Sequence, residues 1–206
     1  MVIDHVVLLT RDADEMAECL RRDLGLGSEP GMFYEKAGTK HHTVPLAPPQ
    51  YLEFIQIEDR ALAAQTETGR LALAVEAAGG GLFHWAVLVD DLEAVSRRLG
   101  KPIEDSTTPQ SDGTLRGWRA VAGTKSLPAF IDYPKNPGRD GRLAAAYARV
   151  GHTCSPGSFS ALSIGASETE MNAWLGEHDL PLSFANGRAG IFEARISTAA
   201  GEITIT

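Results

Sequence analysis

Two histidines stand inside apolar, strand-like segments of this sequence at matching positions. His5 lies in "VIDHVVLLT" and His84 in "LFHWAVLVD", and each is followed seven residues later by an aspartate, Asp12 or Asp91, of the kind that starts a helix. A single histidine inside a protein is usually a structural residue with satisfied hydrogen bonds. Two at equivalent positions indicate a shared chemical role, because imidazole binds metals and moves protons near neutral pH.

Two carboxylates occupy similar apolar surroundings, Glu53 in "YLEFIQI" and Asp132 in "LPAFIDY". Burying a carboxylate without a partner is costly, so a cation, a metal ion or a bound proton is expected beside each. Two imidazoles and two carboxylates suit one divalent ion such as Zn, Ni, Fe or Mn. We therefore predict a metal site with the ligands His5, Glu53, His84 and Asp132. Glu53 and Asp132 are also the predicted catalytic groups, because a carboxylate beside the ion can move a proton.

The elements that would position these side chains form a repeat. In the first unit the spacing predicts a strand over 3–9, a helix from Asp12 to Gly25, and strands over 31–38, 40–46 and 51–57. In the second unit it predicts a strand over 83–89, a helix from Asp91 to Gly100, and strands over 102–108, 115–123 and 127–133. Two such βαβββ modules in tandem predict an α+β fold, in which curled mixed sheets enclose a cleft.

The remaining segments complete the predicted organisation. A short helix is expected within 58–81, and the Gly- and Pro-rich stretch 134–158 is interpreted as a connector with one helical turn at most. A third βαβββ-like unit follows, with a strand over 159–165 and a helix capped by Ser167 and Glu170. The domain prediction is therefore 1–134 for the paired modules, 135–158 for the connector and 159–206 for a third unit packed on the same domain. Because Ser160 replaces histidine there, this unit should be structural or form a wall of the cleft.

Composition narrows the classes of protein to which the chain can belong. Its 206 residues can bury a substantial core, and its formal net charge of -8 disfavours nucleic-acid binding. Apolar runs are too short to cross a membrane, and the opening residues do not resemble a secretion signal, so a cytoplasmic location is expected. Cys19 and Cys154 lie far apart and are interpreted as free thiols.

Several other residues could reach a cleft. His41 and His42 are neighbours on a predicted strand, so only one can face inward, as a base or replacement ligand, and the other is expected to be an exposed edge histidine. His152 and Cys154 could bind metal or react together, although a plain surface loop is the preferred interpretation. Arg116 and Arg119 could pair with an anionic substrate group or face solvent. The aromatic candidates for lining an apolar pocket are Phe33, Tyr34, Tyr51, Trp85, Trp118 and Tyr133.

Three segments carry a resemblance to a known family. "DHVVLLTRDADEM", "FHWAVLVDDLEAV" and the strand "YLEFI" resemble the glyoxalase-like branch of the vicinal oxygen chelate superfamily. The resemblance implies paired modules that close a half-barrel around a metal, with ligands from the first and last strands of each module. Transferred to this sequence, those ligands are His5, Glu53, His84 and Asp132. Asp132 departs from the glutamate that is usual there, and Pro128 leaves the register of its strand open.

Function follows from this site. The leading hypothesis is a lyase, isomerase or dioxygenase that uses a divalent metal ion and acts on a small oxygenated molecule. One alternative is a metal-free protein that binds and sequesters a small molecule; another is a structural domain that works through dimerisation, as a homodimer. Sequence patterns of nucleotide-binding loops, serine hydrolases and HExxH zinc proteases are absent from the chain.

Overall fold

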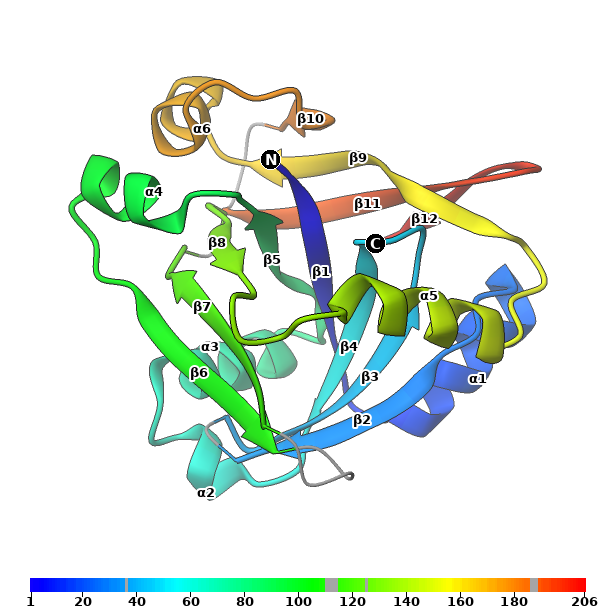
Figure 1. Cartoon of the computed structure of the whole chain (residues 1–206). Coiled ribbons are helices and arrows are strands. Elements are labelled where there is room, and N and C mark those ends of the chain that lie inside the picture. The colour runs from blue at the N-terminus through cyan, green and yellow to red at the C-terminus, as the bar shows by residue number, and fades with distance from the viewer. Residues whose placement is uncertain (36, 110–114, 125, 186–188) are drawn as a thin grey trace.

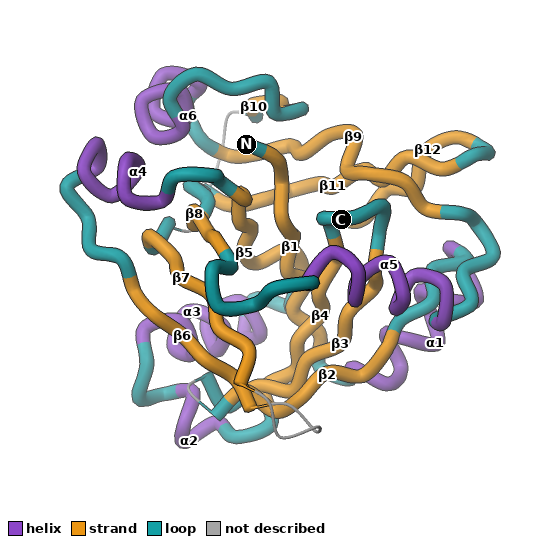
Figure 2. Tube along the Cα trace, viewed as in Figure 1, coloured by secondary structure: helices purple, strands orange, loops and turns teal. Residues whose placement is uncertain are grey.

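A computed structural model describes residues 1–35, 37–109, 115–124, 126–185 and 189–206. The chain forms two β-sheets, a large curled one and a smaller one laid against its outer face, with helices around them (Figures 1 and 2). The first module comprises β1 (Val2–Thr10), α1 (Ala13–Leu24), β2 (Glu29–Tyr34), β3 (Thr39–Pro45) and β4 (Tyr51–Ile57). The second comprises β5 (Gly81–Leu88), α4 (Leu92–Leu99), β6 (Glu104–Pro109), β7 (Leu115–Val121) and β8 (Ala129–Asp132).

The eight-stranded sheet has the order β2-β3-β4-β1-β5-β8-β7-β6, so its two halves mirror each other. In each half the first strand pairs in parallel with the last, β1 with β4 and β5 with β8. The halves meet where β1 and β5 run antiparallel. The predicted α+β fold of tandem βαβββ modules is therefore confirmed, and the sheet curls into a half-barrel with a concave and a convex face (Figure 1).

Both module helices begin and end where the sequence predicts. Asp12 caps α1 by accepting hydrogen bonds from the backbone N–H groups of Asp14 and Glu15, each at 3.0 Å. Asp91 caps α4 through one bond, from Ala94 at 2.7 Å. Gly25 ends α1 in the left-handed conformation with φ 70°, which a side chain would strain. These local signals are strong because they depend on residues within one helical turn.

Two predicted connections are more ordered than expected. The stretch between the modules folds into α2 (Arg60–Ala63) and α3 (Glu67–Ala77) rather than one short helix. The supposed connector 134–158 contains α5 (Arg139–Arg149), a helix of 11 residues, so the prediction of at most one turn was wrong. The prolines of this stretch that suggested a loop precede α5 or follow it, and the helix itself is rich in alanine and arginine, which favour helix.

The third unit has the predicted element order but a different sheet. It consists of β9 (Pro156–Gly165), α6 (Glu168–Leu175), β10 (Leu182–Phe184), β11 (Gly190–Thr198) and β12 (Gly201–Ile205). Its strands lie in the order β10-β9-β11-β12, so β9 sits between β10 and β11, whereas β1 of module one pairs with the last strand of its own module. The third unit is thus not a copy of the module fold.

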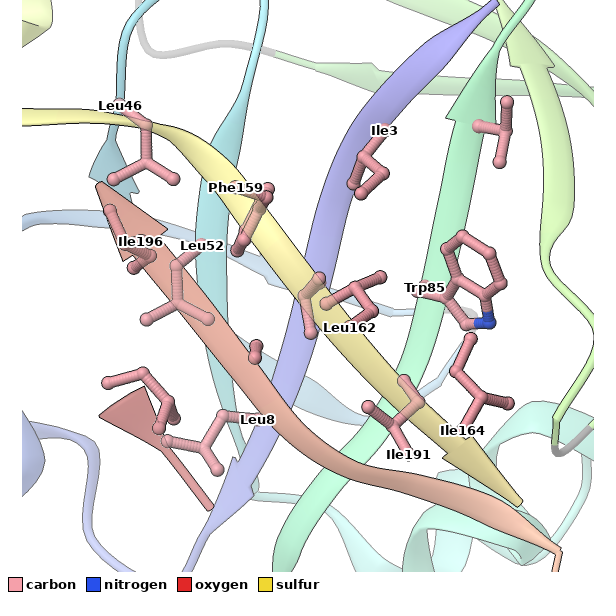
Figure 3. Close-up of a cluster of buried hydrophobic side chains, with 14 of the residues drawn as sticks. Ile3, Leu8, Leu46, Leu52, Trp85, Phe159, Leu162, Ile164, Ile191 and Ile196 are labelled. Atoms are coloured by element: carbon pink, nitrogen blue, oxygen red, sulfur yellow. The ribbon is translucent and has the colours of Figure 1, made fainter. Parts of the chain in front are cut away.

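This second sheet covers the convex face of the large one and closes the main core. Phe159, Leu162 and Ile196 of the second sheet belong to the same buried cluster as Leu52 and Trp85 of the first (Figure 3). Burying large apolar side chains of this kind is the main stabilising contribution to such a fold. Because the third unit packs on the convex side, it is not a wall of the cleft. Ser160 instead donates a hydrogen bond to Glu202 within the small sheet, at 2.6 Å.

The helices α2 and α3 pack on the concave face near one end of β1. Side chains of Val7, Leu9, Ile55 and Ile57 form a buried cluster there with Ala63 and Ala72 of the two helices. On the other side, α5 contacts β3 and lies in front of β3 and β4 in the view of Figure 1. Between these two covers, the concave face carries three of the polar side chains that the sequence singled out, His5, Glu53 and His84.

Candidate functional site

Strand pairing places His5, His84 and Glu53 on one face of the sheet. Val7 of β1 is the partner of Glu53 on β4 and of His84 on β5, and His5 is the partner of Ala86. Residues directly opposite in neighbouring strands share a face. The two imidazole rings have centroids 6.5 Å apart. The structure therefore brings three of the four predicted site residues together at the centre of the concave face.

Glu53 is held at one oxygen by a histidine from the next strand. His41 Nδ1 donates to Glu53 Oε1 at 2.8 Å, and the hydroxyl of Thr39 lies 2.7 Å from His41 Nε2. A carboxylate only accepts, so Nδ1 of His41 carries the proton of this hydrogen bond. Glu53 Oε2 has no hydrogen-bond partner among the described residues, so this oxygen remains available to a bound molecule.

The charges of this cluster act on one another. Burial alone would raise the pKa of Glu53, but the charge and hydrogen bond of His41, with smaller effects of His5 and His84, hold the pKa below its ordinary value. Burial, and then the nearby His5, lower the pKa of His84 from 6.5 to about 4. At neutral pH the concave face therefore presents an ionised carboxylate beside a neutral imidazole.

Aromatic side chains surround this cluster. Tyr51 stacks on His5 with ring centroids 4.8 Å apart. Across the mouth of the half-barrel, Tyr34 of β2 lies 6.0 Å from Trp118 of β7, which brings the two outer parts of the sheet together. Burial raises the pKa of Tyr34, so its hydroxyl stays protonated. The walls are therefore apolar with hydroxyl groups at their edges, as in many small-molecule sites.

Asp132, the fourth predicted ligand, points away from this cluster. It is the β8 partner of Arg119, whose guanidinium donates to both of its carboxylate oxygens at 3.0 and 2.5 Å. Arg119 also pairs with Glu93 of α4, a helix on the convex side. The neighbouring Phe130 faces the same way and is part of the main core. The structure thus corrects the prediction: Asp132 is satisfied by an arginine on the opposite face from His84.

The counterpart of Glu53 in the second module is Ala129. In module one, the residue two places after the histidine, Val7, pairs with Glu53. In module two, the residue two places after His84 is Ala86, and it pairs with Ala129. Asp132 was predicted to be the counterpart of Glu53, because both acids lie in the last strand of their module. The true counterpart lies three residues earlier in the chain. The equivalent position in module two therefore carries no ligand group.

The comparisons with known proteins agree with this architecture. A family described as a Glyoxalase-like domain matches residues 3–178 of the sequence. The chain belongs to this family. The resemblance to glyoxalase-like proteins, carried by residues 3–133, is thereby confirmed. No curated protein matches this glyoxalase-like sequence.

Solved structures to which the chain is similar include two methylmalonyl-CoA epimerases. A Streptomyces coelicolor variant in complex with 2-nitronate-propionyl-CoA is 17% identical, with 65% of this chain and 98% of that chain covered and a TM-score of 0.48. The Mycobacterium tuberculosis enzyme is 19% identical, with 70% and 92% covered and a TM-score of 0.46. Among the residues described, no helix of the glyoxalase-like chain is long and apolar enough to cross a membrane.

The side chains as they stand do not fit the predicted divalent ion. Asp132 is bound by Arg119, and the equivalent of Glu53 is Ala129. Across the described ranges, no three or more His, Cys, Asp or Glu side chains are grouped so that they could hold a metal ion. Ligands must lie within about 2.0–2.2 Å of one point to bind Zn, Ni, Fe or Mn. No step of the chemistry below therefore passes through a metal.

Of the two adjacent histidines, His41 faces inward and His42 outward, as alternation requires. His42 is not the exposed edge residue that was predicted: it is 4% exposed and stacks on Phe54 with centroids 4.8 Å apart. His152 holds loops together, since Gly27 donates to its Nδ1 and its Nε2 bonds to the carbonyl of Pro45. Its neighbour Cys154 donates weakly to the carbonyl of Gly25.

The predicted aromatic lining is only partly found. Tyr34, Tyr51, Trp118 and Tyr133 belong to the concave side. Trp85 is fully buried in the convex core, and Phe33 is exposed. The side chain of Arg116 lies outside the described part of the structure.

Sequence reasoning missed two residues beside His5. Asp4 is fully buried, and it accepts a hydrogen bond from Arg139 at the start of α5. The signal for Asp4 was its place next to His5, but regular alternation along a strand would have put it on the other face. Arg139 also lines a cavity of about 320 Å³ where β5 and β8 end.

Proposed function

We propose that this glyoxalase-like protein binds a small oxygenated molecule on its concave face and moves a proton on it, as an isomerase or a lyase does. The observation that carries the proposal is the position of Glu53, an ionised carboxylate fixed at one oxygen by His41 at 2.8 Å and free at the other. A base held in this way needs little reorganisation before it takes a proton. Glu53 is therefore assigned the role of general base.

The two imidazoles supply the complementary groups. Because the pKa of His84 is about 4, its ring is neutral at pH 7, and its N–H can donate to an oxygen on which negative charge develops. His5 lies beside it and faces the same space. Together they suit the enediolate that forms when a proton is removed next to a carbonyl group.

The surrounding walls indicate the kind of molecule that fits. Tyr51 covers His5, while Tyr34 and Trp118 meet across the mouth. The floor carries the ionised carboxylate of Glu53, and the guanidinium of Arg139 is already paired with the buried Asp4. A neutral, partly apolar carbonyl compound is therefore favoured over a strongly anionic one.

Deuterium exchange tests the proposal without knowledge of the natural substrate. Chelator-treated protein in D₂O is mixed with a panel of small α-hydroxyketones and 2-oxo acids, and NMR follows loss of the proton next to the carbonyl. We expect exchange with at least one compound, and a rate about 100-fold lower in Glu53→Gln, because general base catalysis contributes roughly that much. Glu58→Gln, an exposed site just after β4, is the matched control.

The other outcomes decide between the alternatives. Binding of panel compounds, seen as quenching of tryptophan fluorescence, with no exchange for any of them would overturn the enzyme proposal in favour of a binding protein. If exchange requires added Zn, Ni, Fe or Mn, the proposal that the reaction needs no metal ion is overturned. A cytoplasmic location and a homodimeric state stay predictions, and sedimentation tests the second.

A further inference from the structure

An irregularity in β1 places two consecutive side chains on the same side of the sheet. The pairing of β1 with β5 shifts between Ile3 and His5, so Asp4 has no partner of its own in the ladder. A bulge of this kind redirects a side chain and is common beside functional sites. Its consequence here is that Asp4 does not turn to the convex face, as strict alternation would require, and reaches the ring of His5.

Asp4 uses both carboxylate oxygens, each for a different purpose. Oδ2 lies 2.7 Å from His5 Nδ1 and accepts from the hydroxyl of Tyr133 at 2.8 Å. Oδ1 accepts from Arg139 Nη2 at 2.6 Å. Arg139 in turn lies over the rings of Tyr133 and Tyr51, at 4.1 and 5.6 Å from their centroids. The carboxylate, 0% exposed, is thus fully satisfied and cannot rotate freely.

We propose that Asp4 is a positioning residue that fixes the tautomer of His5, so that the lone pair of His5 Nε2 faces the concave site. This inference rests on the proposed function, because it assigns how one of its imidazoles acts. An ionised carboxylate can only accept a hydrogen bond, so the Nδ1 atom of His5 must carry the proton. In the neutral ring, Nε2 is then an acceptor, able to take a proton or bind a substrate hydroxyl.

The two histidines of the floor would consequently differ. His5 has a buried carboxylate behind it, as the histidine of a Ser-His-Asp triad has. No carboxylate hydrogen-bonds to His84 among the described residues. His5 is the acceptor of the pair, and His84 is free to donate to an oxygen.

Nitrogen NMR of the histidine side chains tests the inference on the unmodified protein. In ¹⁵N-labelled protein at pH 7.5, the tautomer of each ring is read from its two nitrogen shifts, and the signals of His5 are identified by their loss in His5→Gln. We expect the Nδ1–H form for His5. A ring in the Nε2–H form would overturn the proposal, whether or not any substrate is known.

The variant Asp4→Asn sharpens this test because the two oxygens of Asp4 have different partners, Arg139 for Oδ1 and His5 for Oδ2. Arg139 only donates, so the asparagine oxygen must face it, and the amide NH₂ then takes the place of Oδ2 and donates to His5 Nδ1. The ring should switch to the Nε2–H tautomer. Asp23→Asn, which removes an exposed carboxylate on α1, is the matched control and should leave the spectrum of His5 unchanged.

Activity gives the second readout. For a compound that exchanges in the assay above, we expect kcat to fall about 100-fold or more in Asp4→Asn with little change in KM, because a wrong tautomer leaves binding intact. A folded Asp4→Asn protein with the Nε2–H ring and undiminished kcat would overturn the positioning role. If the wild type exchanges nothing, the proposed function fails, while the NMR result still decides the tautomer.

Discussion

The two modules of the large sheet differ in the chemistry that they bring to a shared floor. Both place a histidine at the same point of the first strand, His5 in one and His84 in the other. Module one adds the acid Glu53 with its histidine partner His41, whereas module two places Ala129 at the equivalent position. In the proposed function, module one therefore supplies the base, and module two supplies a neutral hydrogen-bond donor and an apolar wall.

This difference separates the features that stabilise each module from the side chains that serve the shared site. The strand pairing and helix caps recur in both halves because each stabilises its own module. A ligand side chain has no such local function, so it can be replaced by alanine without loss of the fold. The acid near the end of module two, Asp132, instead pairs with Arg119 on the other face.

The largest effect is expected from restoring the missing acid. Ala129→Glu places a carboxylate opposite Glu53 and beside His84, completing a set of two imidazoles and two carboxylates. We expect affinity for Zn²⁺ or Mn²⁺ to rise at least about 100-fold, as added ligands tighten a metal site. Calorimetry on chelator-treated protein measures it, with Ala122→Glu on the exposed chain after β7 as control. Unchanged affinity would show that Ala129 does not face His84.

The low pKa of His84 predicts that the free energy of unfolding decreases in acid. Its pKa is about 4 in the folded protein and 6.5 when unfolded, so the unfolded state binds a proton first as pH falls below 6.5. The free energy of unfolding should drop by about 2 kcal/mol between pH 7 and 5, and the loss should level off below pH 4. In His84→Asn, the free energy of unfolding measured by urea titration should not show this part of the decrease. The partly buried His178→Asn is the control, and the same slope in the wild type and both variants would contradict the assignment.

A smaller difference is expected between the two helix caps. Asp12 receives two backbone N–H groups of α1, and Asp91 receives one of α4. Replacing an aspartate cap by alanine costs about 1 kcal/mol, with a range of roughly 0.5–2. Asp12→Ala should therefore lower the free energy of unfolding more than Asp91→Ala, as measured by chemical denaturation. The reverse order would indicate that packing of α4 depends on its first turn.

The smallest effect on chemistry is expected at Asp132. Asp132→Ala removes the partner of Arg119 and should lower the thermal unfolding midpoint. The exchange rate in the deuterium assay should stay within about twofold of wild type, since changes away from the site are usually nearly neutral. A large loss of exchange with normal folding would place Asp132 back in the chemistry of the concave face.

Prediction from the sequence succeeded where the signal is local and failed where it depends on pairing. The helices from Asp12 and Asp91 were found because caps act within a few residues. Asp132 was misplaced because side chains alternate along a strand, so the face of a residue depends on the register with neighbours. Asp4 was missed for a related reason: the bulge that turns it inward arises from the pairing of β1 with β5.

The sequence by itself determined the family, the order of strands and helices in both modules, and the two matching histidines, because these follow from periodicity, caps and short motifs. Tertiary structure decided which carboxylate lies near the two histidines and which side of the sheet the third unit covers. It also decided that Arg139 of α5 binds Asp4. The physical reason is that a strand exposes its side chains alternately on two faces, and only pairing with other strands settles which face each residue takes.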